Sequence, residues 1–361
     1  MNLPRIDIDS AKIAHNVQKL TTLYGSKGIK IIGVTKVIGG DPTIAGILVD
    51  NGIKILADSR LDNILRMRKA GIRAQYMLLR SPALSQVEKV VTHAHISLNS
   101  ELIVLKELSK HALKNHSIHE VILMVELGDL REGIMPSEME DIVREVVGLK
   151  GIVLVGIGTN LACFGGIAPD PDNMAKLSSI AVHLENKFNI CLDIVSGGNS
   201  ANYRWFKSSK KLGRINSLRL GESIFLGREA LCREPIPGLF TDIFTLVTEV
   251  IEAKQKPSMP YGKAYQNMNG EIPCFKDIGL MSRAILGIGQ QDVLVSGIVP
   301  KQEVTILGAS SDHIVVDNNK ANLTVGDTVT FDLDYNALLR GLNSIHITKN
   351  HVNYQKCQEV L

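Results

Sequence analysis

A chain of 361 residues, 45% of them apolar, is long enough to bury a large core and to form more than one domain. Its 40 basic and 37 acidic residues nearly balance, and no basic block with interleaved aromatic residues occurs, so we expect no nucleic-acid surface. No segment approaches the roughly 18 consecutive apolar residues that predict a membrane span.

The N-terminal segment and the cysteines lead us to expect a cytoplasmic protein. Asp7 and Asp9 interrupt the region in which a secretory signal needs an unbroken apolar run. The cysteines are odd in number and have no metal-type spacing. Scattered cysteines of this kind are typical of reduced thiols rather than of a disulfide framework. They are Cys163, Cys191, Cys232, Cys274 and Cys357.

Short apolar runs alternate with charged, helix-like stretches between about residues 30 and 230. The runs begin near Ile31, Ile55, Gln75, His95, Val121, Ile152, Leu192 and Leu218. The stretches between them include predicted helices at Leu61–Ala70, Glu101–Lys114 and Ser137–Val147. Because the runs are continuously apolar, they predict strands covered on both faces, as in a parallel sheet. Repeated strand-helix units in this number favour a closed (β/α)8 barrel of the TIM type.

The pattern changes after the segment Cys232–Gly238. Alternating, strand-like runs follow and helical segments almost vanish, which predicts an all-β domain. These runs are Phe244–Ile251, Ala284–Ile288, Val293–Val299, Glu303–Leu307, His313–Val316 and Asp327–Leu333. We place the barrel domain at residues 1–236 and the C-terminal β domain at residues 237–361, with a weakly specified tail after about Lys349.

Functional side chains of a (β/α)8 barrel lie where its strands end. The first apolar run is closed by Lys36, whose amine either extends to the solvated rim or points into the mouth, where partial desolvation lowers its pKa. Glycines and serines in Ser196–Ser200 and Arg219–Ser223 can present N–H groups to a phosphate, although such turns also occur for steric reasons alone. A lysine together with these loops predicts a phosphorylated aldehyde cofactor.

A set of longer segments carries a family resemblance. They are RIDIDSAKIAHN, GVTKVIGGD, ELGDLREGI, GIGTNLACFGG, SGGNSANY, LRLGESIFLGRE, GASSDHIVVD and DLDYNALLR. In this order and spacing the chain resembles the alanine racemase superfamily, the fold type III pyridoxal 5'-phosphate (PLP) enzymes, and within it the ornithine racemase branch. The resemblance implies PLP, amino-acid racemisation, and a homodimer whose sites lie between a barrel and the partner's β domain.

The resemblance assigns cofactor contacts residue by residue. Lys36 matches the lysine that carries PLP as a Schiff base and then acts as one base on the substrate's α-carbon. Arg219 matches the arginine that faces the pyridine nitrogen, and because an arginine stays charged it would leave that nitrogen unprotonated. The remaining implied contacts are Arg131 near the phenolic oxygen, Asn160 beside the ring, and Ser200, Gly221, Glu222 and Tyr335 at the phosphate.

The chain also departs from alanine racemases. The stretch after Lys36 reads VIGG, without their phosphate-binding tyrosine, and Ile288–Asp292 reads IGQQD, without their second catalytic tyrosine. The identity of the second catalytic acid is therefore undecided by the resemblance. Cys163 is one candidate, although free cysteines are commonly small buried residues. Ser311 is another, at the place where related ornithine decarboxylases carry a catalytic cysteine. Tyr261 and Tyr265 either serve this role or cover the β domain.

Asp312 bears on the substrate. In the related ornithine decarboxylases an aspartate at this place binds the distal amine of the substrate across the dimer interface. The alternative is that Asp312 is simply a solvated residue of a turn. We therefore expect ornithine as the substrate, with alanine, serine or lysine as alternatives that keep the mechanism. Decarboxylation is a rival, but the run of three glycines typical of those enzymes is missing. A non-catalytic PLP carrier is another rival, but it would not need the second domain.

Histidines suggest a metal site only superficially. His93 and His95 would face one side of a strand and His313 lies far along the chain. No third ligand stands in register with the first two, so we expect no metal.

Overall fold

The computed structural model describes residues 2–263, 265–266, 270, 272 and 274–353, so Cys357 lies outside the described residues. The chain forms two compact units. One comprises residues 11–241, and the other combines residues 2–10 with 242–353. No helix in the described ranges is both long enough and apolar enough to cross a bilayer.

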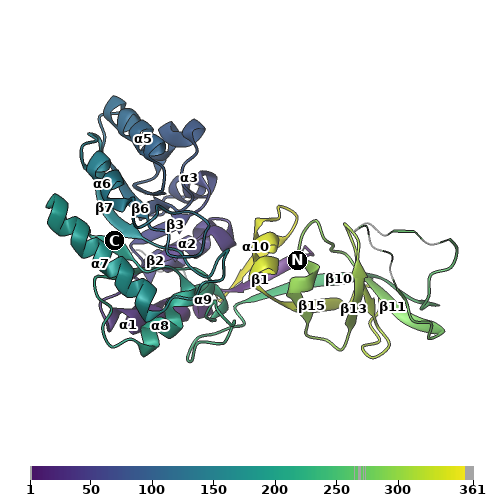
Figure 1. Ribbon diagram of the computed structural model, residues 1–361. Coiled ribbons are helices and arrows are strands. Elements are labelled where there is room, and N and C mark those ends of the chain that lie inside the picture. The colour runs from purple at the N-terminus through teal and green to yellow at the C-terminus, as the bar shows by residue number, and fades with distance from the viewer. Residues whose placement is uncertain (1, 264, 267–269, 271, 273, 354–361) are drawn as a thin grey trace. The chain divides into compact units, whose positions relative to one another are not determined.

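The first unit is a closed barrel of eight parallel strands that follow one another in chain order (Figure 1). The strands are β2 (Lys30–Val34), β3 (Ile55–Asp58), β4 (Gln75–Leu78), β5 (Ile96–Asn99), β6 (His119–Met124), β7 (Ile152–Gly158), β8 (Ile194–Ser196) and β9 (Ser217–Leu220). Aliphatic side chains such as Ile32, Met77, Leu98, Ile122 and Val155 form one buried cluster. The (β/α)8 prediction is confirmed, because each apolar run contributes one barrel strand.

Helices connect the strands of the barrel (Figure 1). They are α1 (Ser10–Gly25), α2 (Pro42–Asp50), α3 (Leu61–Lys69), α4 (Val87–His93), α5 (Leu102–Lys114), α6 (Met139–Val147), α7 (Pro171–Phe188), α8 (Tyr203–Ser208) and α9 (Glu222–Leu226), with short 3-10 helices η1 (Lys36–Ile38), η2 (Leu84–Gln86) and η3 (Ser200–Asn202). The start of α7 follows local capping rules. Asp170 accepts from the Asn173 amide in a capping box, and Pro171 takes the first helical position of α7.

The second unit is a sheet with strand order β12-β15-β10-β11-β14-β13, in which all neighbours are antiparallel. Its strands are β1 (Arg5–Asp9), β10 (Phe244–Pro257), β11 (Leu280–Leu286), β12 (Ile298–Pro300), β13 (Thr305–Ala309), β14 (Ile314–Asp317), β15 (Thr328–Leu333) and β16 (Thr348–Val352). They are accompanied by the 3-10 helix η4 (Val295–Gly297) and the α-helix α10 (Tyr335–Asn343). The prediction of a C-terminal β domain is confirmed, with α10 as its helical addition.

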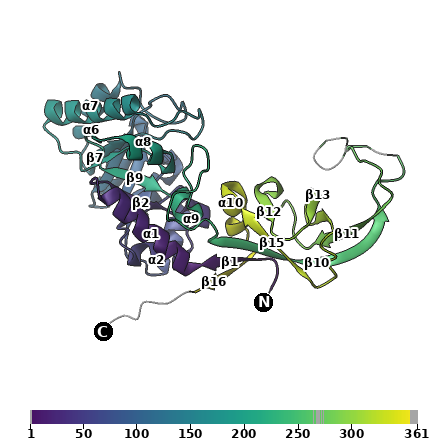
Figure 2. The same ribbon diagram turned by 90° about the horizontal axis from the view of Figure 1, so that it is seen from below.

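The N-terminal strand differs most from the sequence prediction. We assigned residues 1–10 to the barrel domain, but β1 pairs antiparallel with β10 and parallel with β16 (Figure 2). The reason is its alternating pattern, since Ile6 and Ile8 are buried while Arg5 and Asp7 are half-buried. The domain limits at residues 236 and 237 stay a prediction, whereas the compact units divide between Thr241 and Asp242.

Two further segments of the second unit differ from prediction. The run Val293–Val299 is not one strand, because Gly297 turns the chain there; a Cβ at Gly297 would lie 2.3 Å from the carboxylate of Asp334, which caps α10. The predicted tail after Lys349 is wrong up to Val352, because these residues form β16 beside β1.

Candidate active site

Lys36 lies just beyond the end of β2 and opens η1. Its side chain is half-buried. Burial lowers the pKa of Lys36, the nearby Cys163 opposes this shift, and Arg131 adds to it. An amine with a lowered pKa is more often unprotonated and is therefore a better nucleophile.

Asp58 and Thr35 fix the backbone beside Lys36. The Thr35 hydroxyl donates to Asp58 Oδ2 at 2.7 Å, and Asp58 Oδ1 accepts from Asn63 Nδ2 of α3 at 3.0 Å. Gly40 has a φ of 62°, and a Cβ there would lie 2.7 Å from Asn63. Only glycine lets the turn after Lys36 close this tightly on α3. The turn is thereby attached to two neighbouring elements of the barrel.

Arg219, on β9, is only 5% exposed. Its guanidinium donates to Ser196 Oγ at 2.5 Å, to the Thr159 carbonyl at 2.8 Å and to Asn160 Oδ1 at 3.4 Å. Burial lowers the pKa of Arg219 to about 10, so the group still carries its charge at neutral pH. Because Ser196 ends β8 and Thr159 follows β7, Arg219 connects the ends of three neighbouring strands.

Two serines connect the loops after β8 and β9. Ser200 Oγ accepts from the Ser223 amide at 3.1 Å, and the two hydroxyl oxygens lie 3.0 Å apart. Both residues are buried. Gly221 precedes α9, and Glu222 opens it with its carboxylate paired to Arg233. Hydroxyls and backbone N–H groups in the last loops of such a barrel are the groups that bind phosphate.

The loop between β6 and α6 closes on itself. The Glu126 amide donates to the Ile134 carbonyl at 2.9 Å. The Glu126 carboxylate accepts from the amides of Gly128 at 2.6 Å and Leu130 at 3.1 Å. Leu130 has a φ of 54°, which is uncommon for a residue with a Cβ, so these bonds hold a strained turn.

Asp129 joins this loop to the loop after β7. It is 1% exposed, and its carboxylate accepts from the backbone amides of Cys163 at 3.2 Å and of Phe164 and Gly165, both at 3.0 Å. A second bond closes the loop after β7, where the Ala162 amide donates to the Ile167 carbonyl at 2.9 Å. Two loops far apart in sequence are therefore held as one structure.

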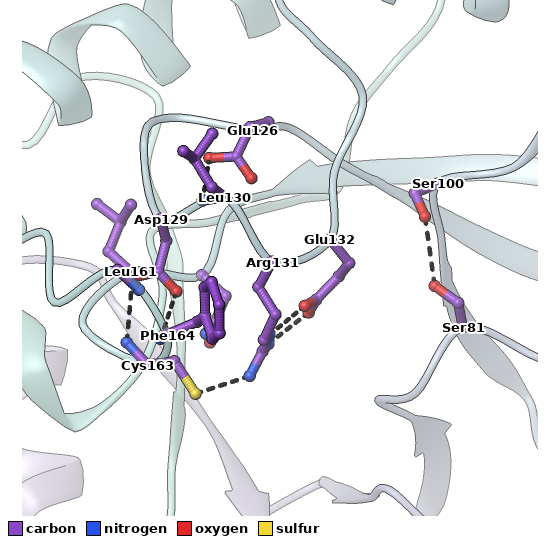
Figure 3. Close-up of polar contacts among 12 residues, drawn as sticks. Ser81, Ser100, Glu126, Asp129, Leu130, Arg131, Glu132, Leu161, Cys163 and Phe164 are labelled. Atoms are coloured by element: carbon purple, nitrogen blue, oxygen red, sulfur yellow. Dashed lines mark hydrogen bonds and ion pairs between the residues drawn. The ribbon is translucent and has the colours of Figure 1, made fainter.

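Arg131 lies between Cys163 and Glu132 (Figure 3). It donates to Cys163 Sγ at 2.7 Å and pairs with the Glu132 carboxylate. The reading of Cys163 as a small buried residue is wrong, because this cysteine is exposed and its sulfur contacts a guanidinium instead of the core.

The barrel therefore gathers most of the residues singled out in the sequence. The charges of Cys163, Arg131 and Arg219 affect the pKa of Lys36, and Asn160 Oδ1 accepts a hydrogen bond from Arg219. The nucleophilic amine is suited to bind an aldehyde, and the buried guanidinium is suited to donate to a pyridine nitrogen. The hydroxyl donors are suited to a phosphate, and the thiol is suited to a proton transfer. No group of three or more metal-ligating side chains occurs among the described residues.

The second unit holds the other predicted residues. Ser311 and Asp312 are exposed in the turn before β14. The Gln290 amide donates to the Ser310 carbonyl at 2.9 Å, and a Cβ at Gly289 would lie 2.2 Å from the Ser311 carbonyl oxygen. The segment that lacks the second catalytic tyrosine is thus adjacent to the turn that carries Ser311 and Asp312.

The tyrosines of this unit have different environments. Tyr335 is half-buried and opens α10, directly after its capping residue Asp334. Tyr261 is 90% exposed and Tyr265 is 69% exposed, so neither covers the core of the β domain.

Sequence reasoning missed three acids. Asp58 closes the second apolar run, so the rule that polar residues at strand ends are functional would have found it. Asp129 and Glu132 flank Arg131 in one short segment, but no local pattern distinguishes a buried acid from a solvated one. Their roles depend on contacts with another loop and with a neighbouring guanidinium.

Arg219→Lys should lower the free energy of unfolding by about 1–3 kcal/mol, because an ammonium cannot reproduce the guanidinium's donors to Ser196 and Thr159 and leaves buried acceptors unpaired. Urea denaturation of the apoprotein measures this. Arg144→Lys is the matched control: Arg144 is exposed on α6, and its exchange should leave the denaturation midpoint nearly unchanged. Equal midpoints for the two variants would contradict the bridging role of Arg219.

Comparison with known proteins gives the family. The family model described as alanine racemase, N-terminal domain, matches residues 8–229. Ornithine racemase of Acetoanaerobium sticklandii is 41% identical over 96% of this chain and 99% of that protein. Lysine racemase of Thermotoga maritima is 38% identical over 97% and 98%, respectively. Alanine racemase from Streptomyces lavendulae, at 15% identity, shares the fold with a TM-score of 0.77, over 98% of this chain and 99% of that chain. The chain belongs to the alanine racemase N-terminal domain family.

Proposed function

We propose that ornithine is the substrate of this amino-acid racemase and that Lys36 holds PLP at the end of β2. The observation that carries the proposal is the placement of Lys36 directly after β2, where burial lowers the pKa of its amine and the charges of Cys163, Arg131 and Arg219 act on it. The similarity to an ornithine racemase and to a lysine racemase over nearly the whole chain supports a diamino acid.

The groups of the barrel fit PLP. Lys36 would hold the aldehyde carbon covalently, and Arg219 would donate to the pyridine nitrogen. Arg131 would donate to the phenolic oxygen, and Asn160 would contact the ring. Bound PLP withdraws electrons from the substrate's α-carbon and so makes its proton removable. The phosphate would be held by the Ser200 hydroxyl with the amides of Gly221 and Glu222, and by Tyr335.

Lys36 has two functions in this account. Its amine would hold the cofactor, and the same Nζ, once released, would remove the proton from one face of the α-carbon. A second acid must supply a proton to the opposite face for the configuration to invert. Cys163 is our candidate from the barrel, and Ser311 is the alternative from the second unit. Arg219, as a permanent donor, would keep the pyridine nitrogen unprotonated and favour simple proton transfer.

We further propose a homodimer in which Ser311 and Asp312 of each subunit serve the site of the other. The distal ammonium of ornithine needs a carboxylate in a desolvated site, because an unpaired buried charge is costly. The exposed turn that carries Asp312 supports this role. We place the enzyme in the cytoplasm, and the unpaired state of Cys163, Cys191, Cys232 and Cys274 in the described chain is compatible with a reducing compartment.

Incubation of the PLP-loaded protein with single L-amino acids, followed by chiral separation, tests the proposed activity. D-ornithine should form faster than the D-enantiomers of lysine, alanine or serine. Faster racemisation of lysine, alanine or serine would leave the proposed mechanism unchanged but would show that ornithine is not the preferred substrate. Release of CO2 would indicate decarboxylation, and absorbance changes without any product would indicate a carrier.

Asp312→Asn should lower kcat/KM for ornithine about 10- to 150-fold, because one charge-assisted hydrogen bond is worth roughly 1.5–3 kcal/mol. Turnover of alanine, which has no distal ammonium, should hardly change. Glu303→Gln, an exposed acid in the same unit, is the matched control and should have no effect. Equal losses for both substrates would contradict the specificity role.

Mixed dimers test whether Asp312 acts across the interface. Asp312→Asn subunits mixed with Lys36→Ala subunits should turn over ornithine faster than either parent, because one of the two sites then carries both defects and the other carries none. Absence of recovery in verified heterodimers would place Asp312 in its own subunit's site.

A further inference from the structure

A buried carboxylate connects the two loops that carry Arg131 and Cys163. Asp129 is 1% exposed, and three successive backbone amides, those of Cys163, Phe164 and Gly165, donate to its two oxygens at 3.0–3.2 Å. These residues belong to an irregular loop and not to a helix start. The carboxylate therefore substitutes for regular secondary structure in this segment.

The energetics favour a dedicated role for Asp129. A buried carboxylate is costly unless hydrogen bonds compensate it, and each bond to a charged group contributes more than a neutral one. Backbone packing adds to the fit: the Gly165 amide also donates to the Asp129 carbonyl at 3.0 Å, and a Cβ at Gly165 would lie 2.7 Å from that oxygen. The two loops can approach this closely because position 165 is glycine.

The same carboxylate determines the distance between a guanidinium and a thiol. Asp129 lies two residues before Arg131, and its bonds end on the amide of Cys163, so it restrains both partners of the 2.7 Å contact between Arg131 and Cys163 Sγ (Figure 3). The thiol lies close enough to Lys36 to influence its pKa. Glu126, by contrast, accepts from two amides of its own loop, those of Gly128 and Leu130.

We propose that Asp129 is a positioning residue that holds Cys163 Sγ against Arg131, so that the thiol can exchange a proton with the α-carbon on the face opposite Lys36. This inference rests on the proposed racemisation. Asp129 touches no reacting atom and acts only through Cys163.

A double-mutant cycle tests the inference with Asp129→Asn, Cys163→Ala and the double variant, each loaded with PLP. Asp129→Asn should lower kcat at least about tenfold, with KM changed less than threefold. The isotope effects for L→D and D→L should become unequal in the same sense as in Cys163→Ala. In the Cys163→Ala background it should cost less than about threefold more, because its partner is already absent. Equal losses in both backgrounds would overturn the inference and leave Asp129 a structural residue.

Hydrogen exchange provides a readout that needs no activity. The amides of Cys163 and Phe164 should exchange at least about tenfold faster in Asp129→Asn, because one carboxylate oxygen is replaced by an amide nitrogen that cannot accept and the other oxygen loses its charge. The Gly165 amide keeps the Asp129 backbone carbonyl as an acceptor and should change less. Asp170→Asn, a carboxylate that caps α7 at the other end of the same loop, is the matched control and should leave them unchanged. Unchanged exchange in Asp129→Asn would overturn the proposed contact. A protein that racemises no amino acid would refute the proposed function instead, and the exchange result would still decide the contact.

Gly165→Ala separates the loops while the carboxylate stays. If Asp129→Asn does not fold, this variant takes its place in the cycle, since its Cβ would displace the turn from the Asp129 carbonyl. It should reproduce the loss in kcat and the dependence on Cys163. Full activity of a folded Gly165→Ala whose amides 163–165 exchange faster would contradict the positioning role.

Discussion

Lys36→Ala should abolish racemisation, with a loss of more than about 10⁴-fold, and should remove the visible absorbance of covalently bound PLP. The lysine is expected to serve twice, as the attachment point of the cofactor and as one of the two bases, so no other residue can compensate. The absorption spectrum of the purified protein and chiral separation of the products measure the two effects.

Lys30→Ala is the matched control for this prediction. Lys30 begins the same strand, β2, but at its other end, and its side chain is exposed. This variant should keep both the absorbance and the activity. Covalent PLP retained in Lys36→Ala would move the attachment site to another lysine and would contradict the assignment.

Cys163→Ala should slow racemisation by roughly 10²–10⁴-fold, the usual effect of removing a general acid or base. Because an acid on one face of the α-carbon gives a proton in one direction and takes it in the other, the isotope effects for L→D and D→L should become unequal. Ser311→Ala, measured in parallel, should cost far less if the thiol is the second acid.

A larger loss of activity in Ser311→Ala than in Cys163→Ala would identify Ser311 as the second acid, with its hydroxyl supplied by the partner subunit. If neither variant loses more than about tenfold, both assignments are wrong and a tyrosine or a bound water must supply the proton. Thermal unfolding of both variants provides the folding control, since each residue is exposed and its truncation should leave stability nearly unchanged.

The barrel could be predicted from the sequence because its signals are local. Each strand is a continuous apolar run, and Lys36 and Arg219 could be located because they lie at the ends or within such runs. The strand β1 could not be assigned in the same way. Its alternation of Ile6 and Ile8 with polar residues predicts a strand, but its pairing with β10 joins residues more than 200 positions apart.

The contacts that organise the site are equally non-local. The motif containing Arg131 was recognised, but the role of Asp129 depends on amides some 34 positions further along the chain. The proximity of Gly289 to Ser311 arises in the same way, from two turns that the sheet brings together. Sequence patterns identify residue types at strand ends, whereas the partners of a buried acid are determined only by the folded chain.

Racemisation of L-ornithine in D2O tests the central claim of two opposed proton-transfer groups most directly. The two enantiomers are separated by chiral chromatography early in the reaction and analysed by mass spectrometry. D-ornithine should carry one deuterium at the α-carbon, and the remaining L-ornithine should be unlabelled. The group on the face where the new C–H bond forms is in exchange with solvent and supplies that deuterium, while the group on the opposite face holds the proton it removed. D-ornithine that keeps its original hydrogen would mean that a single base removes and returns the proton, and would contradict the account.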